Sequence, residues 1–283
     1  MPRLRMICAG VVAGLLLASK GYADSPLPPS EHKLGIDSVG TVEFFAFSEG
    51  YGAVVPAKSA RANVSSYALQ ASTELRVARV PSIFIFEDAL FLLGNSKGQE
   101  DAKRNLQPMI IVGRYGIGAQ IRPFLQLKLT HGENYDFEKP TAAGAPWNSI
   151  SIRLAHREDT ARFENYVEVH FYPPHNEYDP YPSGPFSERI VARYGVEFAK
   201  KIPIPKSRRV FLFTEPLFLF GHSRPQISYN YSAKPLAARL VNGVGFTLKR
   251  SLQLRLTFGE WRYLAGYHRQ TQSWNGLSLR YGW

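Results

Sequence analysis

Gly116–Glu133 reads Gly-Ile-Gly-Ala-Gln-Ile-Arg-Pro-Phe-Leu-Gln-Leu-Lys-Leu-Thr-His-Gly-Glu, and a related stretch returns 127 residues later as Gly243–Glu260. The second stretch reads Gly-Val-Gly-Phe-Thr-Leu-Lys-Arg-Ser-Leu-Gln-Leu-Arg-Leu-Thr-Phe-Gly-Glu, and nine of the eighteen positions are identical. The same offset aligns Trp147–Arg153 with Trp274–Arg280 and Phe86–Gly94 with Phe213–Gly221. A fixed period indicates a repeated architecture. We therefore expect an internal duplication, with halves at about 29–156 and 157–283.

The residues inside this repeat alternate between apolar and polar. In the first copy Leu125, Leu127 and Leu129 are separated by Gln126 and Lys128. A period of two is typical of a β-strand with one apolar and one polar face. Twelve such runs are expected, at 41–47, 67–77, 83–93, 110–121, 125–131, 149–154, 167–172, 194–204, 210–220, 236–248, 252–258 and 277–283. The chain is therefore predicted to be all-β, with residues 24–283 forming one domain.

The connections between the expected strands are alternately short and long. Examples of short joints are 122–124 and 249–251, whereas 95–108 and 222–235 are long. Outer-membrane barrels have this layout, with short periplasmic turns and longer extracellular loops. The polar faces also carry charge, which suits a barrel in lipid, where only helices and closed sheets satisfy the backbone. We predict a transmembrane antiparallel β-barrel of about twelve strands.

The last expected strand carries a further signal. Leu277, Leu279, Tyr281 and Trp283 share one face, and the printed sequence ends on the tryptophan. This pattern resembles the C-terminal signature of Gram-negative outer-membrane β-barrel proteins as a class, without indicating one family. The resemblance implies an outer-membrane location and recognition of Leu279, Tyr281 and Trp283 by the barrel-assembly machinery. Tyr281, Trp283 and Trp261 are expected in the aromatic belts at the membrane interfaces.

Residues 1–23 are predicted to form a cleaved signal peptide. Arg3 and Arg5 precede an apolar run at 6–18, and Gly21-Tyr22-Ala23 is a small-x-small cleavage site. The only cysteine, Cys8, lies in this segment. Disulfides and cysteine-ligated metals are therefore not expected in the mature chain.

The charge of the chain bears on its partners. The formal net charge is +11, and removing the three basic residues of the signal peptide leaves +8. A basic exported protein favours anionic partners, such as lipopolysaccharide in the outer-membrane lipid or small anionic solutes. Nucleic acid is not an expected partner of a protein that leaves the cytoplasm.

The polar face would line the barrel interior, and it carries matched charges in both halves. Lys128 matches Arg255, and Arg153 matches Arg280, so these pairs should face each other across the lumen. Asp88 and Glu215 form a matched acidic pair, for which Pro216 suggests a β-bulge. Rings of basic residues make anion-selective pores. The favoured function is a narrow diffusion channel for small anionic solutes such as acidic sugars; the alternative is a plugged structural or export-partner barrel, because buried charges must be paired.

An outer-membrane lipid-modifying hydrolase is a second alternative. His222 and Ser223 near the end of an expected strand are the catalytic candidates, with His131 at another strand end. No Gly-x-Ser-x-Gly or His-Ser-Asn-Gly motif occurs, so catalysis is not the favoured interpretation. No cofactor is expected, and the scattered histidines predict no metal site. The segment 173–186, rich in proline and tyrosine, is a candidate lid, and Gly116 and Gly118 indicate close backbone approach rather than a nucleotide loop.

Overall fold

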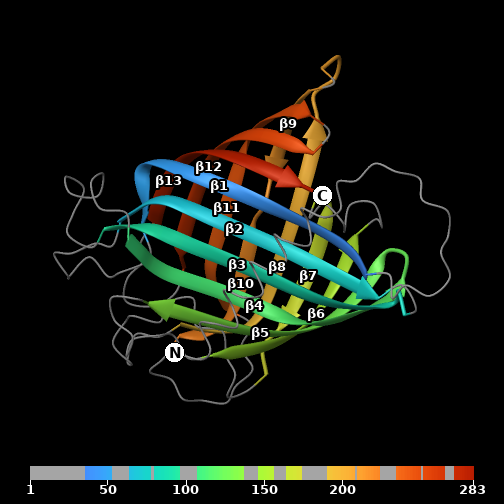
Figure 1. Cartoon of the computed structure of the whole chain (residues 1–283). Coiled ribbons are helices and arrows are strands. Elements are labelled where there is room, and N and C mark those ends of the chain that lie inside the picture. The colour runs from blue at the N-terminus through green and yellow to red at the C-terminus, as the bar shows by residue number, and fades with distance from the viewer. Residues whose placement is uncertain are drawn as a thin grey trace.

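The computed structural model shows a β-barrel (Figure 1) and describes residues 36–52, 64–77, 80–95, 107–136, 146–155, 164–173, 190–207, 209–223, 234–249, 251–264 and 271–283. The first-half strands are β1 (Ile36–Gly52), β2 (Val64–Val77), β3 (Ile83–Asn95), β4 (Gln107–Arg122), β5 (Leu125–Asp136) and β6 (Trp147–Ala155). The second-half strands are β7 (Tyr166–Phe171), β8 (Ile190–Pro203), β9 (Val210–Thr214), β10 (Leu217–Ser223), β11 (Lys234–Lys249), β12 (Leu252–Tyr263) and β13 (Thr271–Gly282). Among these residues no helix is long and apolar enough to cross a membrane.

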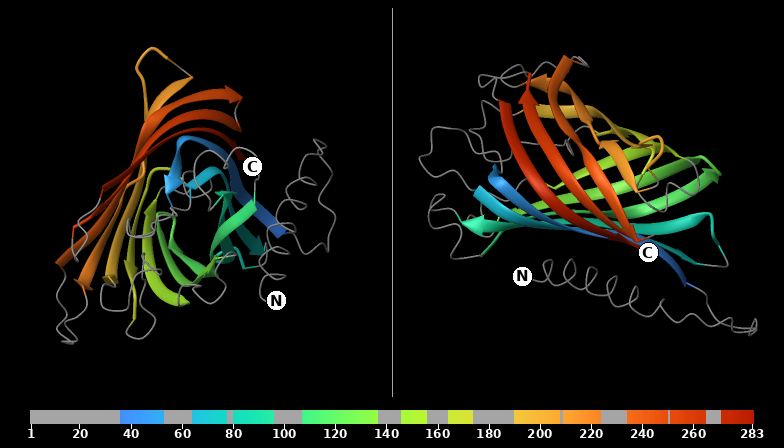
Figure 2. Two further views of the ribbon diagram at one scale, coloured as in Figure 1. Left: turned by 90° about the vertical axis from the view of Figure 1, so that its left-hand side faces the viewer. Right: turned by 90° about the horizontal axis from the view of Figure 1, so that it is seen from above.

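Antiparallel pairing between sequence neighbours runs around the whole wall, and β1 pairs with β13 to close it. The two further views in Figure 2 show β1 lying beside β13. β9 and β10 pair with the same neighbours, β8 and β11, so they are two pieces of one interrupted strand. The barrel therefore has twelve strand positions, as predicted from the sequence.

The strand interruption lies at Glu215 and Pro216. β11 pairs with β9 before the interruption and with β10 after it, in the same register: Asn242 lies opposite Thr214, and Arg239 lies opposite Leu217. At Asp88 the register with β2 and β4 is also continuous. The expected bulges at Asp88 and Glu215 are therefore wrong. Proline lacks the amide hydrogen that a ladder needs, so Pro216 interrupts the pairing without inserting a residue.

The strands follow the 127-residue offset closely. β4 and β11 begin and end 127 residues apart, and so do β5 and β12. Close packing also recurs. A side chain added at Gly118 would meet the Phe84 ring, and one added at Gly245 would meet the Phe211 ring. The close approach expected at Gly118 is confirmed; an origin by duplication stays a prediction.

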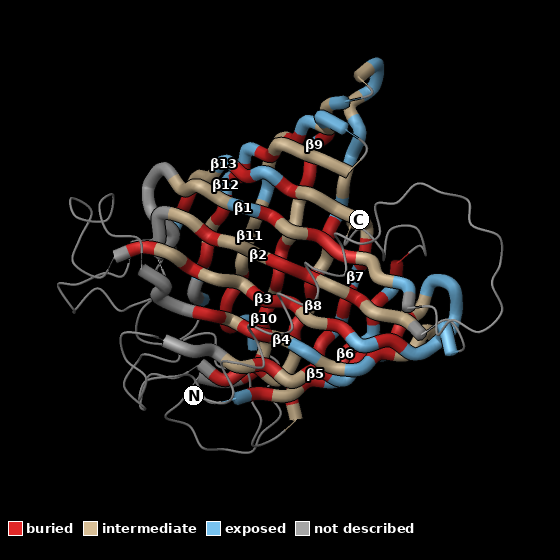
Figure 3. The backbone as a smooth tube through the Cα atoms, viewed as in Figure 1, coloured by how far each residue is buried: buried red, intermediate tan, exposed pale blue. Residues whose placement is uncertain are grey.

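The two faces of the wall differ in chemistry. Burial alternates along most strands (Figure 3), as in β6 and β7. Exposed residues on the outside are large and apolar, among them Ile117, Leu129, Ile152, Val169, Leu256, Phe258, Leu277 and Leu279. An apolar surface of this extent is not stable in water and is stable in lipid. The wall is therefore a membrane-spanning barrel.

Three tryptophans pack inside the barrel, near the rim that carries the long connections. Trp147, Trp261 and Trp274 belong to a buried cluster with Tyr172, Leu219 and Leu236. The expectation that Trp261 lies in an outer aromatic belt is therefore wrong, because its position shares the inward face of Arg255. Tyr281 and Trp283 stack on each other at the opposite rim, with ring centroids 6.3 Å apart.

Several predictions concern segments that the structure does not describe. The signal peptide at 1–23, the cysteine within it and most of the candidate lid at 173–186 lie outside the described residues.

Candidate functional site

The candidate site is the charged barrel interior, where the sequence-predicted residues form two clusters. In the first cluster Glu168 on β7 lies between Arg153 on β6 and Lys128 on β5. The Arg153 guanidinium lies 2.5 Å from a Glu168 carboxylate oxygen, and the Lys128 ammonium lies 3.8 Å from the other oxygen. Ser151 also donates a hydrogen bond to Glu168, at 2.5 Å.

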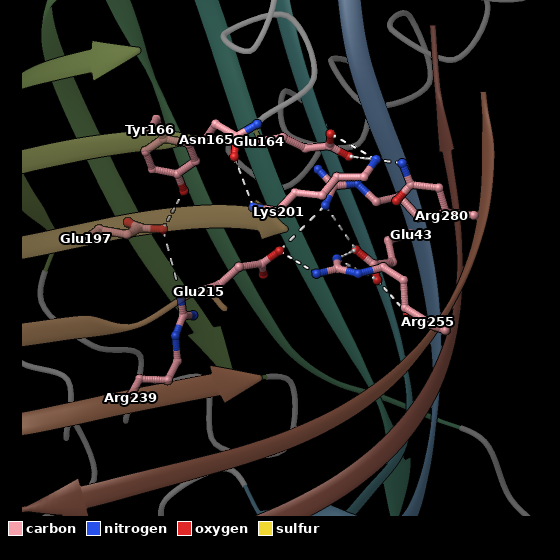
Figure 4. A network of polar contacts seen from close by, with 12 residues as sticks. Glu43, Glu164, Asn165, Tyr166, Glu197, Lys201, Glu215, Arg239, Arg255 and Arg280 are labelled. Carbon is pink, nitrogen blue, oxygen red and sulfur yellow. Dashed lines mark hydrogen bonds and ion pairs between the residues drawn. The ribbon is translucent and has the colours of Figure 1, made fainter. Parts of the chain in front are cut away.

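The second cluster joins Arg255 and Arg280 to two carboxylates (Figure 4). Arg255 lies 3.0 Å from Glu43 and 2.5 Å from Glu215. Arg280 lies farther away, 3.9 Å from Glu43 and 3.7 Å from Glu215. Ser278 donates a hydrogen bond to Glu43 at 2.5 Å.

The two clusters close the two seams at which the halves of the barrel meet. At the β6–β7 seam Arg153 lies directly opposite Glu168, and at the β13–β1 seam Arg280 lies directly opposite Glu43. Ser151 and Ser278 occupy matching positions in the two halves and bind the two glutamates in the same way. Each seam therefore carries a serine, an arginine and a glutamate.

Carboxylates almost balance the basic side chains in the interior. The basic residues in the described strands and turns that form interior ion pairs are Arg76, Arg114, Lys128, Arg153, Lys201, Arg239, Arg255 and Arg280. Their acidic partners are Glu43, Glu74, Asp88, Glu164, Glu168, Glu197 and Glu215. The four matched basic residues and the matched acidic pair Asp88 and Glu215 are therefore only part of the interior charge. Among these ion-paired residues of the described strands and turns, eight basic residues face seven carboxylates.

A third set of charges crosses the middle of the barrel, and we call it the central ion-pair chain. Arg114 lies 3.4 Å from Asp88 and 3.8 Å from Glu197, and Arg239 also lies 3.8 Å from Glu197. Arg114 is on β4 and Glu197 is on β8, so this contact joins parts of the wall that do not pair. The tyrosine hydroxyl of Tyr166 donates to Glu197 at 2.9 Å.

Two cavities adjoin the central ion-pair chain. The first, of about 130 Å³, lies between the chain and β1 and is lined by Phe45, Phe47, Thr257 and Trp274 among others. The second, of about 110 Å³, extends toward β5, β6 and β7. All four members of the central ion-pair chain line both cavities. The sequence-predicted Arg153 also lines both.

Polar contacts cross the interior near the rim that carries the short turns. Gln253 on β12 donates to Glu164, which precedes β7, at 2.9 Å, and the Lys201 ammonium lies 3.2 Å from the same carboxylate. Figure 4 shows Glu164 and Lys201 beside Arg255 and Arg280. These contacts narrow the interior at this end.

The structure places the catalytic candidates only in part. His222 and Ser223 end β10, and their side chains lie outside the described residues. His131 on β5 faces outward, with Nδ1 2.7 Å from the Asn148 amide oxygen and Nε2 3.1 Å from Glu133. No Ser, Thr or Cys takes part in the hydrogen bonds recorded for His131 in the described part of the chain. No metal-binding group of three or more ligands occurs among the described residues either.

The geometry defines the class of the protein. A closed antiparallel barrel with an apolar outside and a polar, charge-paired inside is an outer-membrane β-barrel of the Gram-negative type.

Comparisons with known proteins yield structural likenesses only. No protein-family model matches the chain, and no curated protein matches it. The outer membrane phospholipase A from Escherichia coli is similar over 90% of this chain and 94% of its own, at 9% identity and a TM-score of 0.47. The outer membrane phospholipase of Salmonella typhi covers the same shares at 10% identity and a TM-score of 0.45. The NanC porin is similar over 85% of this chain and 97% of its own, at 5% identity and a TM-score of 0.43. These identities transfer no activity to this chain.

Proposed function

We propose that the barrel is a narrow diffusion channel for small polar solutes with a weak preference for anions. The observation that supports this function is the pair of adjoining cavities inside the barrel, which share a lining of charged side chains. Cavities of this size and polarity hold several water molecules. The ion pairs of the central ion-pair chain between them are 3.4 to 3.8 Å long, longer than a normal hydrogen bond, so a passing solute can exchange contacts with these side chains.

The preference for anions rests on the interior charge. Lys128, Arg153, Arg255 and Arg280 are the proposed selectivity residues, and each lies close to a carboxylate. Their effect on a passing ion is therefore the small net field of the interior and not the sum of four free charges. Because the ion-paired charges of the described residues almost balance, the preference for anions should be modest.

Conductance across a planar bilayer tests the proposal. The purified protein, reconstituted under a salt gradient, should conduct weakly and show a reversal potential displaced toward the anion. Arg153→Gln combined with Arg280→Gln removes two of the eight basic residues that form ion pairs with the seven carboxylates in the described part of the interior. The double variant should therefore displace the reversal potential toward the cation.

The matched control is Arg262→Gln, which removes an outward-facing charge that pairs with Glu260 at the surface. It should leave the reversal potential unchanged. A conducting double variant that keeps the anion preference would contradict the proposed selectivity residues.

A plugged structural barrel is the second candidate function. The contact of Gln253 with Glu164 favours it, because this hydrogen bond joins two parts of the wall that do not pair, near the short turns. A folded wild-type barrel that conducts nothing, and that begins to conduct in Gln253→Ala, would favour this candidate over the channel.

A further inference from the structure

The first cavity is balanced in charge. Its lining includes four carboxylates and four guanidinium groups: Glu43, Asp88, Glu197, Glu215, Arg114, Arg153, Arg239 and Arg280. Its volume is about 130 Å³. An engineered apolar cavity of about 150 Å³ binds benzene, so the first cavity has room for a small organic molecule.

The ion pairs that face the cavity have hydrogen-bonding capacity left. Arg114 approaches Asp88 and Glu197 only to 3.4 and 3.8 Å, and Arg239 approaches Glu197 only to 3.8 Å. By contrast, Arg153 meets Glu168 at 2.5 Å. Hydrogen bonds between nitrogen and oxygen are normally 2.7 to 3.2 Å long. The Arg114 and Arg239 guanidinium groups and the Asp88 carboxylate can therefore bind a ligand.

Thr257 provides an independent observation. Its side chain is only 5% exposed and lines the first cavity. Its hydroxyl oxygen has no hydrogen-bond partner among the described residues. Buried hydroxyl groups are nearly always hydrogen-bonded, so a water molecule or a polar group of a ligand is the expected partner of this one.

One side of the cavity is apolar. Phe45 and Phe47 on β1, Leu90 and Leu92 on β3, and Trp274 on β13 line it. A bound molecule therefore meets charged groups of both signs on one side and an apolar wall on the other.

We infer that the first cavity binds a small zwitterion with an apolar body, of which an apolar α-amino acid is the simplest example. The ligand carboxylate meets Arg114 and Arg239, the ligand ammonium meets Asp88 and Glu215, and the apolar body packs against Trp274. A singly charged ligand would leave one charge uncompensated in a site whose own charges already balance. The inference deepens the proposed function, because it names a class of solute that this channel would hold on its way through.

Calorimetric titration of the folded protein in detergent tests the inference. The probe is L-leucine, and the matched analogues are 4-methylpentanoate, which lacks the ammonium group, and 3-methylbutylamine, which lacks the carboxylate. L-leucine should bind saturably, and each analogue should bind at least tenfold more weakly. Equal binding of 4-methylpentanoate, or no saturable binding of L-leucine, would overturn the inference.

Two variants locate the site. Thr257→Val keeps the shape of the side chain, removes the hydroxyl group and should weaken L-leucine binding several-fold. Asp88→Asn should reduce the preference for L-leucine over 4-methylpentanoate. Arg262→Gln, outside the barrel, should change neither. Unchanged binding in Thr257→Val would place the ligand elsewhere and overturn the assignment, and this variant serves even where Asp88→Asn fails to fold.

The outcome is separable from that of the channel. Saturable L-leucine binding by a barrel that does not conduct would end the proposed function and support the inference. Conductance without L-leucine binding would support the proposed channel function and overturn the inference of a zwitterion site.

Discussion

Glu168 holds the first ion cluster together in a place where only 2% of its surface is exposed. It accepts hydrogen bonds from Ser151 and Arg153 and lies beside Lys128. Charges buried in this way are tolerated only while they remain paired. The interior arginines therefore contribute to the stability of the barrel as well as to the electrostatic field in its interior.

Replacing Glu168 by Gln should destabilise the folded barrel markedly. Arg153 and Lys128 would stay buried beside a neutral amide, and breaking a buried pair typically costs about 3–5 kcal/mol. Urea unfolding of the protein in detergent micelles, followed by tryptophan fluorescence, measures the change in the free energy of unfolding.

The control is Glu260→Gln at the outer pair with Arg262, whose side chain is half exposed. Exposed ion pairs contribute little to stability, so this variant should unfold close to wild type. Equal stability of both variants would show that Glu168 does not hold the cluster.

Gly118 gives a second prediction, on packing. A β-carbon placed there would lie 2.1 Å from the Phe84 ring, which is itself fully buried. Gly118→Ala should therefore cost about 1–3 kcal/mol through overpacking. Gly276→Ala, where the nearest atom lies at 3.2 Å, should cost less. Adding Phe84→Leu to Gly118→Ala should recover part of the loss, and strict additivity of the two changes would contradict this close contact.

At the scale of strands, the alternation of apolar and polar residues was enough to predict the wall. A period of two fixes which face a residue joins, so Lys128, Arg153, Arg255 and Arg280 were correctly predicted to face inward. The same parity predicts that Trp261 faces inward. The expectation of an aromatic belt gave the opposite and wrong position for this residue. Several strands are longer than predicted, because polar residues extend them beyond the segment in which apolar and polar residues alternate.

The partners of the interior charges could not be predicted from alternation. Glu43 contacts Arg255, 212 residues away in the chain, and the register between β1 and β13 is not encoded by any local pattern. Arg114 and Arg239 were missed for another reason. Valine occupies the matching position of each in the other half, at Val241 and Val112, so matched charges reveal neither residue.

The end of β13 carries a prediction on assembly. The Trp283 amide donates to the Gly40 carbonyl at 3.0 Å, and its ring packs over Gly40 at the β13–β1 seam. We propose that the barrel-assembly machinery recognises this strand through Leu279, Tyr281 and Trp283. Trp283→Ala should then lower the amount of heat-modifiable barrel in the outer membrane several-fold.

Refolding of purified protein in detergent separates assembly from stability. The Trp283→Ala variant should refold with nearly the wild-type yield when no assembly machinery is present. An equal fall in both measurements would mean that Trp283 acts on barrel stability alone.

At the scale of the whole molecule, the interior contains a network of ion pairs rather than a ring of basic residues. Ion pairs near the short turns, along both seams and in the central ion-pair chain leave two cavities between them. Any solute that passes must exchange its contacts with these pairs one after another. A small conductance with a weak charge preference is the expected outcome of such an interior.

The recurrence of serine, arginine and glutamate at both seams makes each half of the chain self-complementary. Residues 161–283 carry Glu168 on their first strand and Ser278 and Arg280 on their last, so the last strand of one copy can pair with the first strand of another if Arg280 lies opposite Glu168, as Arg153 does at the β6–β7 seam. The β13–β1 seam has a different register, because at the 127-residue offset Glu43 aligns with His170 and not with Glu168. We expect this fragment, refolded in detergent, to form a homodimer whose two copies close a full-sized barrel, as measured by light scattering. Arg280→Gln should weaken the dimer, and a fragment that stays monomeric would contradict the match. A chain of half the length would then be enough to close a barrel.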